Sequence, residues 1–150
     1  MKEDYFDDVF DFVSERIKFE RIEKDYELRK VESDVFDRKT MLVLYDLMKH
    51  GVFDIIEFPL KIGKEANVFR ARKGKRFRAV KIYRTSTMNF NAIIEYISGD
   101  PRFEHFKRSK RALISIWAQK EYRNLFDCYE NGVLVPKPYA FQENVIVMEY

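Results

Sequence analysis

The sequence predicts an α+β fold, in which a five-stranded antiparallel sheet carries one long helix and follows further helices. Three observations support this prediction: two hairpin patterns, a strand-like run ahead of the first hairpin, and a long helical segment between the hairpins. The helical segment is expected from residue 110 to about 130, after Ser109 as N-cap and before Asn131-Gly132. The strand runs are rich in β-branched and aromatic residues. They cover residues 52–59, 65–71, 77–83, 139–142 and 145–150.

Two helices are predicted ahead of the sheet, and together they form an N-terminal helical extension over residues 1–51. In the first helix, apolar residues recur at helical spacing at positions 6, 9, 10, 13 and 17. Ser33-Asp34 is the candidate N-cap of the second helix, which is expected to run to about His50 and to end at Gly51. Both helices are expected to serve packing. The apolar face of the second is predicted at Met41, Leu44, Tyr45 and Met48.

Composition limits the class of protein. The chain has 150 residues, of which 46% are hydrophobic, so it is expected to be one domain, or one domain with an appendage, around a sizeable core. Its net charge of +3 is too small to indicate nucleic-acid binding by itself. One cysteine, Cys128, excludes an internal disulfide and fits a reducing compartment. With no signal-peptide pattern and no long apolar run, a cytoplasmic protein without a membrane segment is expected.

The third predicted strand carries the first candidate functional residue, Lys81. Side chains alternate along a strand, so Ala79 and Lys81 are expected on one face with Tyr83, and Val80 and Ile82 on the other. Ala79-Val80-Lys81 matches the V-A-I-K strand signature of kinases at its Ala and Lys. A small Ala leaves room for a flat ring, and an ammonium two residues later can reach phosphate oxygens. Taken alone, Lys81 is better explained as a solvated strand lysine, and the loop and Glu121 described below are what favour the functional interpretation.

The residues before the first hairpin resemble a phosphate-binding loop. Residues 61–68 have the register of the kinase loop G-x-G-x-x-G-x-V, but only Gly63 and Val68 are retained from that pattern.

Glu121 is the second candidate, in the middle of the long predicted helix. A carboxylate within an apolar stripe is costly unless a cation pairs with it, and Lys81 is the candidate partner. The alternative is that the apolar stripe is shifted and Glu121 only flanks it. The stripe predicted around Glu121 consists of Ile114, Trp117, Leu125 and Cys128.

The order of these features resembles a protein-kinase N-lobe and hinge, and in detail the RIO family of atypical serine kinases, RIO-one subfamily. The resemblance covers residues 50–150 strongly and the N-terminal helices loosely. Five segments carry it, in this order: Gly63-Lys64-Glu65-Ala66-Asn67-Val68-Phe69, Ala79-Val80-Lys81-Ile82-Tyr83-Arg84, Gly99-Asp100-Pro101-Arg102-Phe103, Trp117-Ala118-Gln119-Lys120-Glu121-Tyr122-Arg123-Asn124-Leu125 and Val147-Met148-Glu149-Tyr150.

The resemblance implies a role for each matching residue. Lys81 would bind the α- and β-phosphates of ATP and pair with Glu121, while Gly63, Lys64 and neighbouring backbone N–H groups would cover the phosphates. Met148 would stand at the gatekeeper position, and Glu149 would hydrogen-bond adenine through its carbonyl. The implied ATP-binding residues are Ile62, Gly63, Lys64, Val68, Ala79, Lys81, Met148 and Glu149.

The resemblance also implies the context of the activity. Family members are serine kinases or ATPases that act in small-ribosomal-subunit maturation, and residues 84–108 correspond to the family's flexible loop. The chain has Lys61-Ile62-Gly63 where the family usually has Ser-Thr-Gly. It also lacks an H-x-D segment with a downstream Asn, which phosphoryl transfer requires for Mg²⁺ and substrate. We therefore expect residues 52–150 to be a kinase N-lobe ending at the hinge, with the Mg²⁺ ligands on a C-lobe beyond Tyr150.

Two other interpretations remain open. One is a non-catalytic, kinase-like module that docks on RNA or a ribosomal protein through the basic residues 102–111. The other is a purely structural α+β domain, in which the placement of Lys81 and Glu121 is chance. Ser109 and residues 85–87 are candidate autophosphorylation sites.

Overall fold

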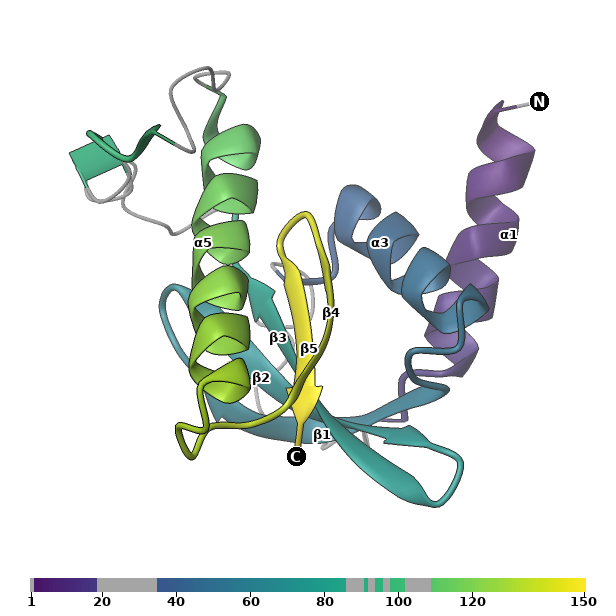
Figure 1. Cartoon of the computed structure of the whole chain (residues 1–150). Helices are drawn as coiled ribbons and strands as arrows, with labels where there is room; N and C mark the ends of the chain where they lie inside the picture. Colours follow the sequence, from purple (N-terminus) through teal and green to yellow (C-terminus); the bar gives the residue numbers. More distant parts are fainter. Residues whose placement is uncertain (1, 19–34, 86–90, 92–93, 96–97, 102–108) are drawn as a thin grey trace.

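Five antiparallel strands form one sheet in the order β1-β2-β3-β5-β4 (Figure 1). The structure, a computed structural model, describes residues 2–18, 35–85, 91, 94–95, 98–101 and 109–150. The predicted fold class and the number of strands are confirmed. The strands are β1 Ile55–Ile62, β2 Ala66–Lys73, β3 Arg76–Tyr83, β4 Pro138–Gln142 and β5 Val145–Glu149, and the helices are α1 Lys2–Glu15, α3 Arg38–Lys49 and α5 Lys110–Glu130.

Helices cover the two faces of the sheet, α5 on one side and α3 with α1 on the other (Figure 1). The predicted alternation along β3 is confirmed, because Val80 and Ile82 belong to the core under α3, whereas Tyr83 belongs to the core under α5. Ile146 of β5 joins Tyr83 under α5, and its neighbour Val147 joins the opposite core. The sheet therefore separates two apolar layers.

Helix α1 buries a slightly different set of side chains from the one predicted. Val9 and Val13 are buried as expected, but Phe10 is 48% exposed, and Phe12 packs on the core in its place. The buried side of α1 is thus rotated toward Phe12. Two bonds hold the end of this segment to β1: Lys18 N–H donates to the Ile56 carbonyl, and Ile56 N–H donates to the Arg16 carbonyl.

Helix α3 begins later than predicted. Its N-cap is Asp37, whose carboxylate accepts a hydrogen bond from the Thr40 N–H at 2.8 Å. The predicted cap, Ser33-Asp34, was therefore wrong, and those two residues lie outside the described part of the chain. Val43 and Leu47 are buried in addition to the predicted apolar face, because α3 lies between α1 and the sheet. His50 caps the other end, exposed to solvent.

Strand boundaries shift by a few residues from the predicted ones. β1 starts at Ile55 and continues to Ile62, through Pro59, where the ladder is irregular and a missing N–H is tolerated. The first hairpin turns at Gly74, which has a φ of 58°. Between β3 and α5, residues 91 and 94–95 are described and are helical. No helix in the described part combines the length and the apolar character that crossing a membrane requires.

Candidate functional site

The predicted pair of charged side chains is brought together. The ammonium of Lys81, on β3, donates a hydrogen bond to Oε1 of Glu121, on α5, over 2.6 Å. Their side chains are 24% and 38% exposed, respectively, so the pair lies at the edge of the α5 core and opens toward solvent. The ammonium is also 5.0 Å from the centroid of the Tyr83 ring. Lys81 is therefore not the freely solvated strand lysine that was the alternative.

Helix α5 holds Glu121 on the side of the helix that is covered, as predicted. The residues of α5 that form or pack on the core beneath it include Leu113, Ile114, Trp117 and Ala118. Leu125 and Cys128, the other two members of the predicted stripe, are partly buried. Glu121 therefore lies among the covered residues, and Lys81 supplies the cation that a carboxylate there requires.

Tyr122, next to Glu121, adds an aromatic contact between α5 and the sheet. Its ring stacks on Phe141 of β4 with the ring centroids 5.9 Å apart. Burial of the hydroxyl raises the pKa of Tyr122 above its usual value, because the charged form loses hydration. The helix is thereby held against β4 one residue from the candidate carboxylate.

A tight turn joins β1 to β2 at Gly63. The Gly63 N–H donates to the Ala66 carbonyl and to Oδ1 of Asn67, both at 3.1 Å. A Cβ at this position would lie 2.9 Å from the Ala66 carbonyl oxygen, so only glycine fits without a backbone shift. The Gly63 N–H is thus engaged within its own turn. Gly63 shapes the loop that presents Lys64.

Asn67 is a residue that the sequence reasoning passed over. It is fully buried, and its side chain fastens the Gly63 turn from within β2. The available signal was the residue type, because asparagine is depleted in strand interiors. An asparagine in the middle of a strand run therefore suggests a local hydrogen-bonding duty such as this one.

Val68, Ala79 and Met148 lie beside Lys81 on one face of the sheet. Val68 pairs across the ladder with Lys81, and Ala79 pairs with Met148. Because paired residues of antiparallel strands share a face, these side chains form a strip next to the ammonium. Ile62 ends β1, where it pairs with Asn67 in the row of Ile82 on the opposite face, and it is 45% exposed. A flat apolar surface beside a fixed cation fits a purine nucleotide chemically.

The end of β5, the predicted hinge, is tied to β4. The Glu149 N–H donates to the Lys137 carbonyl at 2.8 Å, and the Glu149 carboxylate accepts from the Lys137 N–H at 3.1 Å. A hollow of about 290 Å³ lies beside this strand end, lined by Leu134, Val135, Pro136, Glu149 and Tyr150.

Metal ligation has no candidate in the described part of the chain, where no three His, Cys, Asp or Glu side chains gather closely enough to hold an ion. An ion pair links two of the five segments that resemble the RIO family. Nζ of Lys120, on α5, lies 3.3 Å from Oδ2 of Asp100, and each side chain is only 15% exposed.

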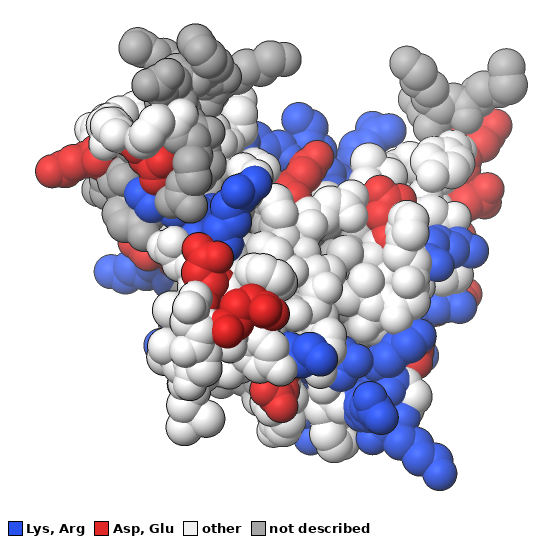
Figure 2. Space-filling model, in the orientation of Figure 1, with Lys and Arg blue, Asp and Glu red and all other residues white. Residues whose placement is uncertain are grey.

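The basic segment predicted as a docking surface is divided. Residues 102–108 lie outside the described part, and Ser109 is the N-cap of α5, as predicted. Arg111 is not free for docking, because its side chain is 19% exposed and binds Asp37 and Glu143. This prediction was therefore wrong for Arg111. Figure 2 shows Lys and Arg gathered at the lower right instead, where the β2–β3 hairpin lies; its exposed basic residues include Arg72, Lys75 and Arg76.

Comparison with known proteins gives the family. A family model described as the RIO domain matches residues 67–150, more than half of the chain. This chain belongs to the RIO family.

Named relatives of the RIO chain agree. It is 44% identical over 127 residues to the RIO-type serine/threonine-protein kinase Rio1 of Haloferax volcanii, covering 84% of this chain and 44% of the relative. It is 43% identical to the Rio1 of Methanocaldococcus jannaschii over 87% of this chain and 45% of the relative, and 34% identical to human RIO1 over 85% and 23%. The RIO chain thus spans less than half the length of these relatives.

Solved structures support the RIO fold. The Rio2 kinase of Chaetomium thermophilum, in a complex with ADP, Mg²⁺ and phosphoaspartate, superposes with a TM-score of 0.57. The match covers 74% of the RIO chain and 32% of the other, with 21% sequence identity. The kinase-like N-lobe fold predicted from the sequence is confirmed.

Proposed function

We propose that this chain is the ATP-binding lobe of a RIO-type serine/threonine protein kinase. The observation that carries the proposal is the 2.6 Å contact between Lys81 and Glu121, beside an apolar strip on the same face of the sheet. A lysine held by a helix carboxylate is the arrangement that kinases use to bind the α- and β-phosphates of ATP. Kinase activity in the named relatives supports the same assignment.

Each residue has a proposed duty in ATP binding. Lys81 binds phosphate oxygens, and Glu121 keeps its ammonium pointing at them. Gly63 shapes the turn that presents Lys64 toward the phosphates, and Ile62 and Val68 cover the base from the β1–β2 side. The remaining contacts to adenine come from Ala79, Met148 and Glu149.

The reaction itself is proposed for the intact protein. ATP supplies the γ-phosphoryl group, which is transferred to serine or, in an ATPase cycle, to water. Mg²⁺ and the carboxylate that orients the nucleophile are assigned to a C-lobe, in line with the match covering only 44% of the Haloferax volcanii relative. We accordingly propose residues 1–51 as a helical extension and residues 52–150 as the N-lobe. A role in small-ribosomal-subunit maturation in the cytoplasm is part of this proposal.

Replacing Lys81 tests the proposal. Lys81→Ala in the intact protein should abolish phosphotransfer and weaken ATP binding, measured by radiolabelled phosphate transfer and by fluorescent-nucleotide titration. Lys75→Ala is the matched control, because Lys75 is an exposed lysine in the same hairpin. Unchanged ATP affinity and activity in Lys81→Ala would refute the assignment.

A second candidate function is docking on RNA or a ribosomal protein. The exposed basic residues of the β2–β3 hairpin favour it, namely Arg72, Lys75 and Arg76. Changing all three to Gln should weaken binding to a small-subunit RNA and reduce the slope of log affinity against log salt by about 2 to 3. An unaltered slope would count against docking through this hairpin. It would not bear on the proposal of ATP binding.

A further inference from the structure

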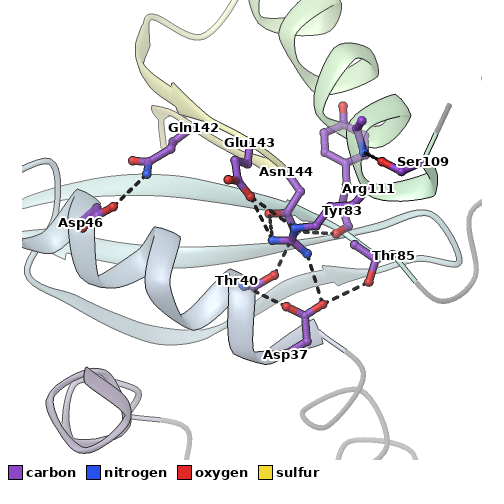
Figure 3. A network of polar contacts seen from close by, with 11 residues as sticks. Asp37, Thr40, Asp46, Tyr83, Thr85, Ser109, Arg111, Gln142, Glu143 and Asn144 are labelled. Atoms are coloured by element: carbon purple, nitrogen blue, oxygen red, sulfur yellow. Dashed lines mark hydrogen bonds and ion pairs between the residues drawn. The ribbon is translucent and has the colours of Figure 1, made fainter. Parts of the chain in front are cut away.

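A network of polar side chains connects the start of α5 to the start of α3 and to the β4–β5 turn (Figure 3). Arg111, in the first turn of α5, is its centre. Its guanidinium donates to Oε2 of Glu143 through Nη2 and Nε, at 3.2 and 3.3 Å, and to Oδ1 of Asn144 at 3.4 Å. The third contact is an ion pair with Oδ2 of Asp37, at 3.5 Å.

The partners of Arg111 are themselves held. Asp37 caps α3 through the Thr40 N–H, and it also accepts a 3.1 Å hydrogen bond from the Thr85 hydroxyl. The buried Asn144 donates through Nδ2 to the Thr40 hydroxyl and to the Tyr83 carbonyl, both at 3.0 Å. The start of α3, the end of β3, the β4–β5 turn and the start of α5 therefore meet at one point.

This junction bears on Glu121 because a helix transmits position along its length. Glu121 lies ten residues after Arg111, about 15 Å along the axis at the usual rise per residue. Apolar packing is non-directional, and only three residues of α5 are fully buried, so packing alone allows the helix to slide or rotate. A guanidinium with several fixed acceptors is directional, and it fixes both the axial position and the rotation of the first turn.

We propose that Arg111 and Asp37 are positioning residues, which hold α5 at the register where Glu121 meets Lys81. The inference rests on the proposed function for its catalytic meaning. It gives the N-terminal extension a part in that function, because Asp37 belongs to the extension and acts on the site through α5. Neither residue needs to touch the nucleotide.

The reactivity of Lys81 tests the positioning without any nucleotide. The rate of Lys81 acetylation by acetic anhydride is measured in the intact protein by mass spectrometry, relative to the exposed Lys75. Arg111→Ala should raise this ratio about fivefold, toward the value of Glu121→Gln, because a lysine released from its carboxylate reacts faster. Arg123→Ala, which removes an exposed arginine of the same helix, should leave the ratio unchanged.

Conservative variants keep the test valid if Arg111→Ala folds poorly. Asp37→Asn retains an oxygen that can cap α3 and removes only the charge that faces Arg111. Arg111→Lys retains the charge and removes the planar fork. Both should raise the Lys81 ratio by a smaller factor than Arg111→Ala. A ratio equal to that of the unmodified protein in all three variants would overturn the proposal.

A double-mutant cycle separates positioning from general destabilisation. In the intact kinase, Arg111→Ala should lower kcat/KM for ATP about tenfold alone, but less than twofold when Glu121 is already Gln, since the two act through one contact. Independent, multiplicative effects would overturn the proposal. If the unmodified protein binds no ATP, the proposed function fails, while the acetylation result still decides the positioning.

Discussion

The two faces of the sheet do different work, although the same strands build both. Under α3 and α1, the side chains of alternate strand residues are buried in a continuous apolar layer that includes Phe69, Val80 and Val147. On the other face, α5 covers only part of the surface, and the side chains of Lys81 and Glu121 stay 24% and 38% exposed.

The difference in coverage explains how one sheet can both stabilise the fold and offer a binding surface. A face that is fully covered gains free energy from burial and has no room for a ligand. A face that is partly covered retains an ion pair and an apolar strip in contact with solvent, which a ligand needs. Adjacent residues of one strand can therefore be assigned opposite duties, and single substitutions can test that assignment.

The largest difference in stability is expected between two adjacent residues of β2 that face opposite sides of the sheet. Phe69→Ala should lower the free energy of unfolding by about 3–5 kcal/mol, since Phe69 is 1% exposed and its removal leaves a cavity. Val68→Ala, on the partly covered face, should cost much less stability and should weaken ATP binding. Urea denaturation and nucleotide titration measure the two quantities. Equal losses of stability would break the division between the faces.

Asn144 connects α3 to the end of β3, so its loss should lower the free energy of unfolding. Asn144→Ala should cost about 1–3 kcal/mol in denaturant unfolding, because it leaves the Tyr83 carbonyl and the Thr40 hydroxyl without their buried partner. Asn124→Ala, on the exposed side of α5, is the control and should stay within about 0.5 kcal/mol. A loss as small as that of the control would show that the junction contributes little.

Glu121→Gln should affect binding more than folding. The ion pair is partly exposed, so its loss should cost less than about 1 kcal/mol of stability. ATP affinity should fall about tenfold in the intact protein, because the Lys81 ammonium loses the acceptor that orients it. The melting temperature and fluorescent-nucleotide binding are measured in parallel. A variant that loses stability and keeps its affinity would reverse the assignment of this face.

The smallest effect is expected at the distant tip of the sheet. Asp54 accepts a 2.7 Å hydrogen bond from the Gly74 N–H, which lowers the pKa of its carboxyl, and Lys73 lowers it further. The charged form therefore stabilises the fold above the unfolded-state pKa near 3.8, and this contribution is lost as pH falls through the lowered folded-state value.

Asp54→Asn tests this contribution. It should cost at most about 1 kcal/mol at pH 7, and the difference from the unmodified protein should shrink below about pH 4. A difference that grows as the solution is acidified would contradict the assignment. ATP affinity should not change, since Asp54 is remote from Lys81 along the sheet.

Local pattern was sufficient for the elements and for the candidate pair. Strand alternation placed Lys81 opposite Val80, and helical spacing placed Glu121 beside Ile114, so their meeting could be predicted. The same local signals failed at the α3 cap, where Ser33-Asp34 and Asp37 are both good capping residues, and only packing selects between them.

By itself, the sequence determined the antiparallel sheet, the direction of each strand side chain and the family, because these depend on short periods and contiguous segments. Only the tertiary structure decided that Arg111 binds Asp37 and Glu143, and that Asn144 connects the Thr40 hydroxyl to the Tyr83 carbonyl. Those facts depend on which surfaces meet in space. The free energy of each contact comes from partners that are far apart along the chain.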